Sequence, residues 1–291
     1  MIQYANHHTQ TQVRQMWKTV FGDSDAYMDI YFREKYRNEH TLVYLVNDEA
    51  VASLQMLPYS FTFCDKEIPA AYISGACTLP EARKKGYMEQ LLLKSFEEMA
   101  KNNVPLSILV PQEAWLLRFY EKYGYTQTFD AGDEDLPSLK TLLHKHLQDT
   151  QEAYREFNVQ FRTKDMTVQK TINDFRTIVE EAQLFHFPPK KNLGGMARII
   201  DAKRLLTIFA QKYPHSSFST RVFDGQLKKN NATFVISNSE VMETSSVVEP
   251  TTHTDIRKLT RLLFGYHTSN EEESIRSLFP EKTPQMNYML E

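Results

Sequence analysis

The sequence has few of the features that mark secreted, membrane-spanning or zinc-binding proteins. Its 291 residues include two cysteines, Cys64 and Cys77, which argues against a disulfide framework and suits reduced thiols in a cytoplasm. Residues 1–17 lack the apolar run of a signal peptide, and no run of about 18 apolar residues occurs anywhere. We therefore expect a soluble, cytoplasmic protein.

The distribution of charged residues and histidines argues against nucleic-acid, membrane and metal partners. The net charge is −3 with both signs mixed along the chain, so we expect no nucleic-acid partner and no membrane partner. The nine histidines, including His7, His8, His144 and His146, show no third partner at metal spacing, so we expect no metal. Hydrophobic residues make up 41% of the chain, which is enough to bury a sizeable core.

The first 130 residues alternate between helical and strand-like patterns. Apolar residues recur at helical spacing in four segments, 10–21, 25–36, 86–100 and 114–123. Strand-like runs occupy 41–46, 51–56, 61–63, 70–79 and 106–110. This order predicts an α/β fold in which helices flank a mixed sheet.

The remainder of the chain predicts helices followed by a second mixed unit. Residues 139–157 and 167–185 look helical, and a helix is expected at 196–210. Strand-like segments follow at 218–223, 232–237 and 241–248, and then a helix from 255 to 264 with Thr254 as its cap. We divide the chain into a first domain (1–132), a helical connector (133–192) and an α+β domain (193–291).

One basic segment lies between a predicted strand and a predicted helix, and it reads Arg83-Lys84-Lys85-Gly86-Tyr87-Met88. Backbone N–H groups and the positive helix end converge there, as in sites that bind pyrophosphate. Gly86 has no Cβ to block an anion, and the three basic residues add positive charge. A solvated basic turn before an ordinary helix explains this motif equally well if it stands alone.

A second motif follows about thirty residues later, at the end of the next predicted helix. It reads Phe119-Tyr-Glu-Lys-Tyr-Gly-Tyr125. Together the two motifs resemble the GNAT acetyltransferases, which have a coenzyme A loop of the form Arg/Gln-x-x-Gly-x-Gly/Ala. In that family a later helix often ends in an aromatic-Tyr-x-x-aromatic-Gly-aromatic run.

The resemblance implies a GNAT-type mixed central sheet and an acetyl-CoA site. By resemblance, a strand edge pairs with the pantetheine arm through Ala76, Cys77, Thr78 and Leu79. The pyrophosphate would be wrapped by Arg83, Lys84, Lys85, Gly86, Tyr87 and Met88. Cys77 is expected to be a small buried residue rather than a nucleophile, because the family transfers acetyl directly.

Two groups are candidates for acid–base chemistry. By its position four residues before Gly124, Tyr120 matches the family's general acid, although a core aromatic is the alternative.

Met88 and the tail Pro284–Glu291 resemble the branch named after the mycobacterial Eis aminoglycoside acetyltransferases. In that branch the terminal carboxylate enters the active site, which makes Glu291 a candidate proton acceptor or amine anchor; a disordered terminus is the alternative.

The same branch implies a C-terminal sterol-carrier-like domain. Gly195-Met-Ala-Arg-Ile-Ile-Asp201 followed by Leu205-Leu206 looks like the opening of that domain, and Arg198 is expected to pair with Asp201. The apolar residues there are more typical of core than of a lipid groove. The chain departs from the branch in the middle, where about 60 helical residues replace a second acetyltransferase-like domain.

The sequence therefore predicts an acetyl-CoA dependent N-acetyltransferase that acts on a primary amine of a small molecule. Asp23, Asp25, Asp29 and Glu34 suggest a cationic amine or a lysine-like group, although carboxylates of this kind are more often caps or solvent-facing charges. The alternative is a non-catalytic acyl-CoA sensor or an apolar-ligand carrier on the same fold. A homo-oligomer is left open.

Overall fold

A mixed sheet of eight strands forms the centre of the protein. The computed structural model describes residues 1–244 and 249–290. The strands of this sheet are β1 (Ile2–Tyr4), β2 (Thr41–Val46), β3 (Glu49–Phe63), β4 (Lys66–Thr78), β5 (Leu106–Leu109), β6 (Thr126–Phe129), β7 (Thr167–Gln169) and β8 (Gly195–Ile199). Their order is β1-β2-β3-β4-β5-β8-β6, and β7 pairs with β3. The β4–β5 pair is parallel and the other pairs are antiparallel.

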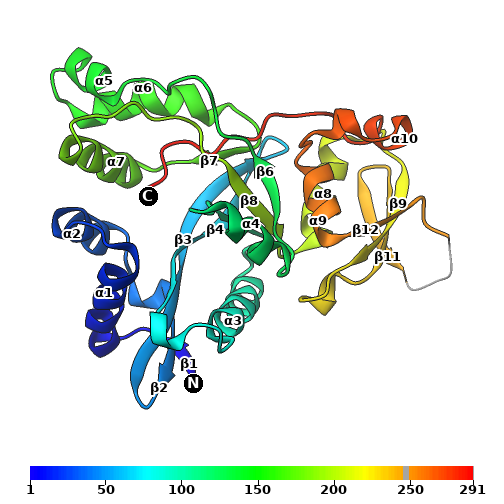
Figure 1. Cartoon of the computed structure of the whole chain (residues 1–291). Coiled ribbons are helices and arrows are strands. Elements are labelled where there is room, and N and C mark those ends of the chain that lie inside the picture. Colours follow the sequence, from blue (N-terminus) through cyan, green and yellow to red (C-terminus); the bar gives the residue numbers. More distant parts are fainter. Residues whose placement is uncertain (245–248, 291) are drawn as a thin grey trace.

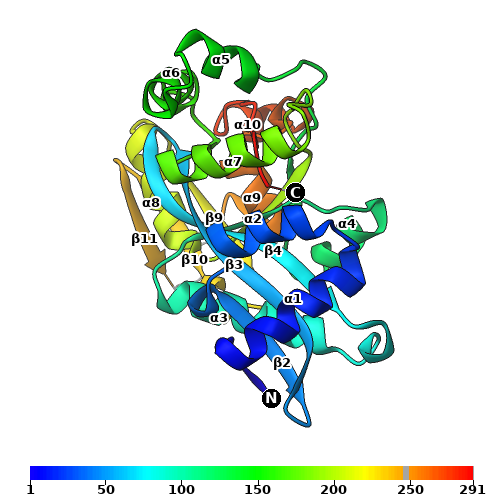
Figure 2. The same cartoon turned by 90° about the vertical axis from the view of Figure 1, so that its left-hand side faces the viewer.

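Helices cover both faces of this sheet, as Figures 1 and 2 show. One face is covered by α1 (His7–Phe21) and α2 (Asp25–Glu34), and the other by α3 (Tyr87–Lys101) and α4 (Ala114–Glu121). The predicted α/β fold class and these four helices are confirmed. A capping box between Asn6 and Thr9 starts α1, and Gly22 ends it at a φ of 73°.

The chain between β6 and β8 forms a helical layer, α5 (Leu139–Lys145), α6 (Thr150–Arg162) and α7 (Ile172–Leu184). These helices bury a separate apolar cluster that includes Phe157, Phe175 and Ile178. The helical expectation for 139–157 and 167–185 was largely right. It missed β7, a three-residue strand whose side chains are all buried against β3.

A second sheet lies beside the first, with the order β11-β10-β9-β12. Its strands are β9 (Phe218–Phe223), β10 (Thr233–Ser237), β11 (Glu240–Thr244) and β12 (Thr252–Asp255), and its helices are α8 (Ala202–Lys212), α9 (Ile256–Leu263) and α10 (Glu273–Arg276). Residues 245–248 of the predicted strand 241–248 lie outside the described part. The cap of α9 is Asp255 rather than Thr254, which is in β12; the Asp255 carboxylate accepts from the N–H of Lys258.

The expected helix at 196–210 is wrong in its first half. Gly195–Ile199 is β8, and it lies between β5 and β6 in the first sheet. All five residues are buried, so the segment has no alternation of buried and exposed positions. Without that alternation, the sequence does not distinguish a buried strand from a buried helix. The first sheet therefore extends past residue 193, where we drew a domain boundary; the three-part division itself stays a prediction.

The C-terminal segment returns from α10 to the first sheet (Figure 1). The N–H of Leu193 donates to the carbonyl of Met286 at 2.8 Å, and the Tyr288 hydroxyl donates to the carbonyl of Pro137. Residues 286–290 are all buried. The tail is thus held against the first sheet up to Leu290, and Glu291 lies outside the described residues.

Candidate active site

The two parallel strands of the central sheet separate along their length. β4 and β5 pair at three positions, from Ala70↔Leu106 to Tyr72↔Ile108. β5 ends at Leu109, whereas β4 continues to Thr78. Beyond Tyr72 this edge of β4 has no strand partner among the described residues, so backbone groups are available to an extended ligand.

A β-bulge changes the direction of β4 near the point where β4 leaves β5. Ser53 pairs with Cys77 and Gln55 pairs with Ser74, so β4 carries one residue more than β3 between these pairs. Gly75 has a φ of 56°, and a Cβ there would lie 2.4 Å from Cζ3 of Trp17. Glycine is therefore required both by the backbone and by the close approach of α1. A glycine inside a strand pattern is a signal for such a bulge, and the sequence reasoning missed it.

The loop after β4 ends at a helix N-terminus that has no side-chain cap. Gly86 is the N-cap residue of α3 at a φ of 77°, and the first intrahelical bond runs from the N–H of Gln90 to the carbonyl of Gly86. A Cβ at Gly86 would meet no atom within 4 Å. The open N–H groups at this end suit an anion.

The basic side chains of that loop point to solvent. Arg83, Lys84 and Lys85 are exposed, and Lys84 has a φ of 61°. Nε of Arg83 donates to the carbonyl of Thr78 at 3.3 Å. Tyr87 is half-buried and stacks on Tyr44, with 4.3 Å between the ring centroids. The loop thus combines an open helix end with a rim of positive charge.

Tyr120 lies in the same buried cluster as the separating ends of β4 and β5. This cluster includes Ile73 and Leu109, and Ala76 and Met88 pack against it. Burial raises the pKa of Tyr120 to about 12, so the hydroxyl is protonated at neutral pH. The hydroxyl has no hydrogen-bond partner among the described residues. Its helix, α4, ends in the aromatic-rich turn Tyr123-Gly124-Tyr125.

Cys77 belongs to the opposite face of β4. It is 3% exposed and is part of the cluster beneath α1 and α2, whereas Ala76 packs on the α3 side. Burial raises the pKa of its thiol to about 11, and its Sγ lies 3.5 Å from Oγ of Ser53. The thiolate that a nucleophile requires is therefore disfavoured.

Polar groups on this α1–α2 face form a cluster that the sequence reasoning missed. The hydroxyl of Tyr31 donates to Oε1 of Gln55 at 3.0 Å and lies 2.7 Å from Oγ of Ser74. The Tyr27 hydroxyl and Nε2 of Gln55 are buried and have no hydrogen-bond partner in the part of the chain that the structure describes. Burial raises the pKa of both tyrosines well above 10. The cluster thus offers unpaired polar atoms beside the bulge.

The four acidic residues of the α1–α2 region differ in their partners. Asp25, Asp29 and Glu34 pair with Lys18, Arg14 and Arg33, respectively. Asp23 instead accepts from Nε1 of Trp17 at 2.6 Å and has no ion-pair partner among the described residues. Since Trp17 contacts the bulge, Asp23 is the carboxylate of this group that the structure connects to the separated strands.

The structure thus assembles much of the predicted site. The separated edge of β4, the uncapped end of α3 and Tyr120 lie around one region of the first sheet. Glu291, predicted to contribute its α-carboxylate, is outside the described residues. Within residues 1–244 and 249–290, no group of three His, Cys, Asp or Glu side chains has the arrangement of a metal site. No helix in these ranges has the length and apolarity needed to cross a bilayer.

Several solved structures share this fold over nearly the whole chain. A GCN5-related N-acetyltransferase from Anabaena variabilis ATCC 29413 is 15% identical, with a TM-score of 0.67 and 98% of both chains covered. Eis1 from Mycobacterium abscessus is 12% identical, with a TM-score of 0.66 and 98% of both chains covered. A GCN5-related N-acetyltransferase from Kribbella flavida is 11% identical, with a TM-score of 0.70, and the match covers 98% of this chain and 96% of that one.

At these identities the solved structures show a shared fold. No curated protein matches the chain. The family model described as an acetyltransferase (GNAT) domain matches residues 1–128. This range contains β4, β5, the uncapped end of α3 and Tyr120. Residues 1–128, less than half of the chain, are therefore similar to the acetyltransferase domain of the GNAT family.

Proposed function

We propose that the protein transfers the acetyl group of acetyl-CoA to a primary amine of a small cationic molecule or a lysine-like group. The observation that carries this proposal is the separation of β4 from β5 directly before a loop that ends at an uncapped helix N-terminus. A strand edge suits the amide-containing pantetheine arm, and the helix end suits the pyrophosphate. Acetyl-CoA supplies the activated thioester.

We assign the cofactor-binding residues by this arrangement as part of the proposal. Ala76, Cys77 and Thr78 lie on the part of β4 beyond its pairing with β5, and Leu79, whose N–H donates to the carbonyl of Val51, follows them. Arg83, Lys84 and Lys85 add charge at the rim, and Gly86, Tyr87 and Met88 provide N–H groups at the start of α3. A loop of this kind binds phosphates by backbone N–H groups as well as by charge, so salt should weaken the binding only in part.

Tyr120 is proposed to assist departure of the sulfur. In the reaction the amine nitrogen bonds to the acetyl carbon, the carbon–sulfur bond breaks, and the sulfur takes up a proton. A tyrosine with a pKa of about 12 is a much weaker acid than a thiol with a pKa of about 8.5. Tyr120 therefore acts as a hydrogen-bond donor that stabilises charge developing on the sulfur and keeps its own proton, and the proton that the amine nitrogen loses on forming the amide balances the one that the sulfur takes up.

The acceptor is proposed to enter from the α1–α2 face of the sheet. Tyr27, Gln55 and Ser74 offer polar atoms there, and Asp23 offers a carboxylate without an ion-pair partner among the described residues. These groups favour an amine over an anionic acceptor. We propose the terminal carboxylate of Glu291 as a further amine anchor or proton acceptor.

The architecture further supports an Eis-like arrangement. The fold shared with Eis1 covers both sheets, and we propose that β9–β12 with α8 and α9 form a sterol-carrier-like unit that packs on the acetyltransferase domain. Cytoplasmic location, the lack of nucleic-acid and membrane partners, and a homo-oligomer stay predictions.

The test is calorimetric titration of the wild type and two Gly86 variants with acetyl-CoA, followed by turnover assays on a panel of amines. Gly86→Asp places a carboxylate in the open space before α3. Gly86→Asn has nearly the same shape and backbone strain without the charge. We expect micromolar binding by the wild type, a modest loss in Gly86→Asn, and at least a further tenfold loss in Gly86→Asp. No binding by the wild type would overturn the proposal, and binding without turnover on any amine would favour an acyl-CoA sensor.

A further inference from the structure

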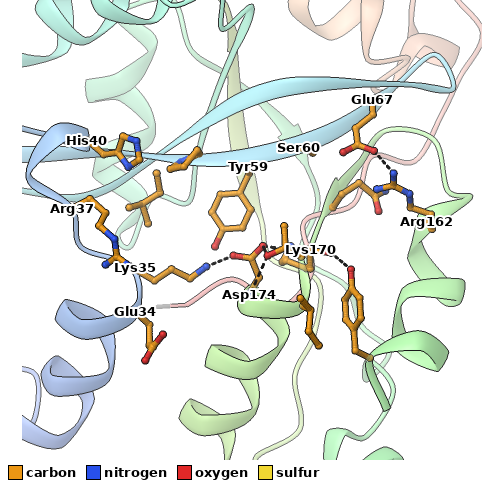
Figure 3. A pocket seen from close by; sticks show the side chains of 16 residues that line it. Glu34, Lys35, Arg37, His40, Tyr59, Ser60, Glu67, Arg162, Lys170 and Asp174 are labelled. Atoms are coloured by element: carbon orange, nitrogen blue, oxygen red, sulfur yellow. Dashed lines mark hydrogen bonds and ion pairs between the residues drawn. The ribbon is translucent and has the colours of Figure 1, made fainter. Parts of the chain in front are cut away.

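A cavity lies on the α2 side of the first sheet, beside the point where β4 leaves β5: Leu57 in its lining pairs with Tyr72 of β4, and the Tyr59 ring centroid is 6.0 Å from that of Tyr72. Its volume is about 680 Å³, and it lies between the end of α2, the middle of β3, and helices α6 and α7. Figure 3 shows Lys35, Tyr59, Lys170 and Asp174 gathered at its centre. None of the residues proposed for acetyl transfer lines this cavity, whereas Glu34, which pairs with Arg33, does.

Lys170 is the unusual group in this cavity. It is 5% exposed, and no carboxylate of the described residues lies within ion-pair distance of its Nζ. Its two hydrogen bonds are long, 3.4 Å to the carbonyl of Val168 and 3.5 Å to Oδ1 of Asn287. An ammonium group has three N–H donors, so at least one is unused. Burial lowers the pKa of Lys170 to about 7; Asp174 opposes this shift and Lys35 adds to it.

The nearby carboxylate of Asp174 is already occupied. Its Oδ1 pairs with Nζ of Lys35, and its Oδ2 accepts from both the N–H and the hydroxyl of Thr171 at 2.7 Å. Lys35 and Lys170 both lie near the ring of Tyr59, at 5.0 and 5.4 Å from its centroid. Two lysines thus share one carboxylate, which leaves one positive charge uncompensated when Lys170 is protonated.

Part of the wall around this charge is apolar, although most of the lining residues are charged or polar. Leu57, Pro58, Tyr59 and Ile172 line the cavity, and its volume is in the range of small-molecule sites. We propose that this cavity binds a small organic monoanion whose carboxylate accepts hydrogen bonds from the ammonium of Lys170 and whose apolar part lies against Leu57, Tyr59 and Ile172. A monoanion matches the one charge of the two lysines that Asp174 leaves uncompensated, whereas a dianion would also face Asp174.

Binding should depend on pH through Lys170, because an anion stabilises its protonated form. Above about pH 7 the free protein must take up a proton to bind, so the affinity falls by about 50-fold from pH 7 to pH 9. Between pH 7 and pH 9 these neighbours keep their charge state, because burial lowers the pKa of His40 and raises the pKa values of Tyr59 and Tyr154. Burial raises the pKa of Asp174, but Lys35 and Thr171 outweigh it, so the carboxylate is ionised. The other charged groups around the cavity are Glu34, Lys35, Arg37, Glu67 and Arg162.

The experiment is calorimetric titration of the full chain at pH 7 with hexanoate, 1-hexanol and hexylamine, which share a chain length and differ in charge. We expect hexanoate to bind at least tenfold more tightly than the other two. Lys170→Met should remove this preference, because methionine fills similar space without charge. Lys140→Met, on an exposed position of α5 outside the cavity, should keep it. Equal affinity for hexanoate and hexanol, or a preference for hexylamine, would overturn the proposal.

A second measurement needs no variant. Titration of the wild type with hexanoate at pH 8 in buffers of different ionisation enthalpy should show uptake of close to one proton per ligand bound. Binding without proton uptake would show that Lys170 is not the partner and would also overturn the proposal. Neither measurement uses acetyl-CoA or Gly86, so failure here leaves the acetyltransferase proposal untouched.

Discussion

Arg198 and Asp224 form an ion pair in which neither side chain is exposed, with Nη2 of the arginine 2.9 Å from Oδ1 of the aspartate. Arg198 is on β8 of the first sheet, and Asp224 follows β9 of the second sheet. The expected partner of Arg198, Asp201, instead caps α8. Arg198 also lies close to the turn after α4, because a Cβ added at Gly124 would be 3.3 Å from its Cζ.

Removing one member of this pair should destabilise the protein strongly. Asp224→Ala leaves the buried guanidinium without its carboxylate, and the expected loss in the free energy of unfolding is about 3–5 kcal/mol. Arg155→Ala, which breaks an exposed pair with Glu152 on α6, should cost less than about 1 kcal/mol. Urea unfolding measures both. Similar losses for the two variants would contradict the structural role of the pair.

Tyr120→Phe should lower kcat by about 100-fold and leave the affinity for acetyl-CoA within about threefold. The change removes only a hydroxyl that has no hydrogen-bond partner among the described residues, so the fold should be kept. Tyr123→Phe, at the end of the same helix, is the matched control and should keep full activity. Stopped assays with an accepted amine give kcat, and calorimetry gives the affinity. An unchanged kcat for Tyr120→Phe would show that Tyr120 is a core aromatic residue and does not assist departure of the sulfur.

The sequence predicted those parts of the fold and site that depend on local patterns. Helical spacing located α1 to α4, and two short motifs located the loop before α3 and the end of α4. It missed features that depend on distant partners. β8 is buried on both faces and so lacks alternation, and the partner of Arg198 is 26 residues away in sequence. Lys170 could not be singled out either, because its altered pKa arises from burial by segments far apart in the chain.

Charge reversal in the loop before α3 should weaken acetyl-CoA binding in a salt-dependent way. Lys84→Glu combined with Lys85→Glu places two carboxylates beside the proposed phosphate site, and we expect at least a tenfold loss of affinity at low salt. The loss should shrink at 0.5 M salt, because both side chains are exposed and therefore screened. Lys140→Glu combined with Lys145→Glu makes the same change of net charge on α5 and should have little effect. Equal losses in the two double variants would point to net charge rather than to this loop.

The two thiols should react slowly while the protein is folded. Burial raises the pKa of Cys77 to about 11 and that of Cys64 to about 12. At pH 8 a thiol with a pKa of about 11 has roughly 200-fold less thiolate than a free cysteine at about 8.5, and limited access slows it further. A chromogenic disulfide reagent should therefore label both thiols rapidly in denaturant and at least 100-fold more slowly in buffer.

The same reasoning bears on catalysis by direct transfer. If acetyl passes straight to the amine, Cys77→Ala should keep kcat within about threefold, since its side chain is on the α1–α2 side of β4 and is protonated at neutral pH. Incubation of the wild type with acetyl-CoA alone, followed by intact-mass measurement, should show no acetyl group on the protein. A stable acetyl adduct that disappears in Cys77→Ala, together with loss of turnover, would replace direct transfer by a two-step reaction through the thiol.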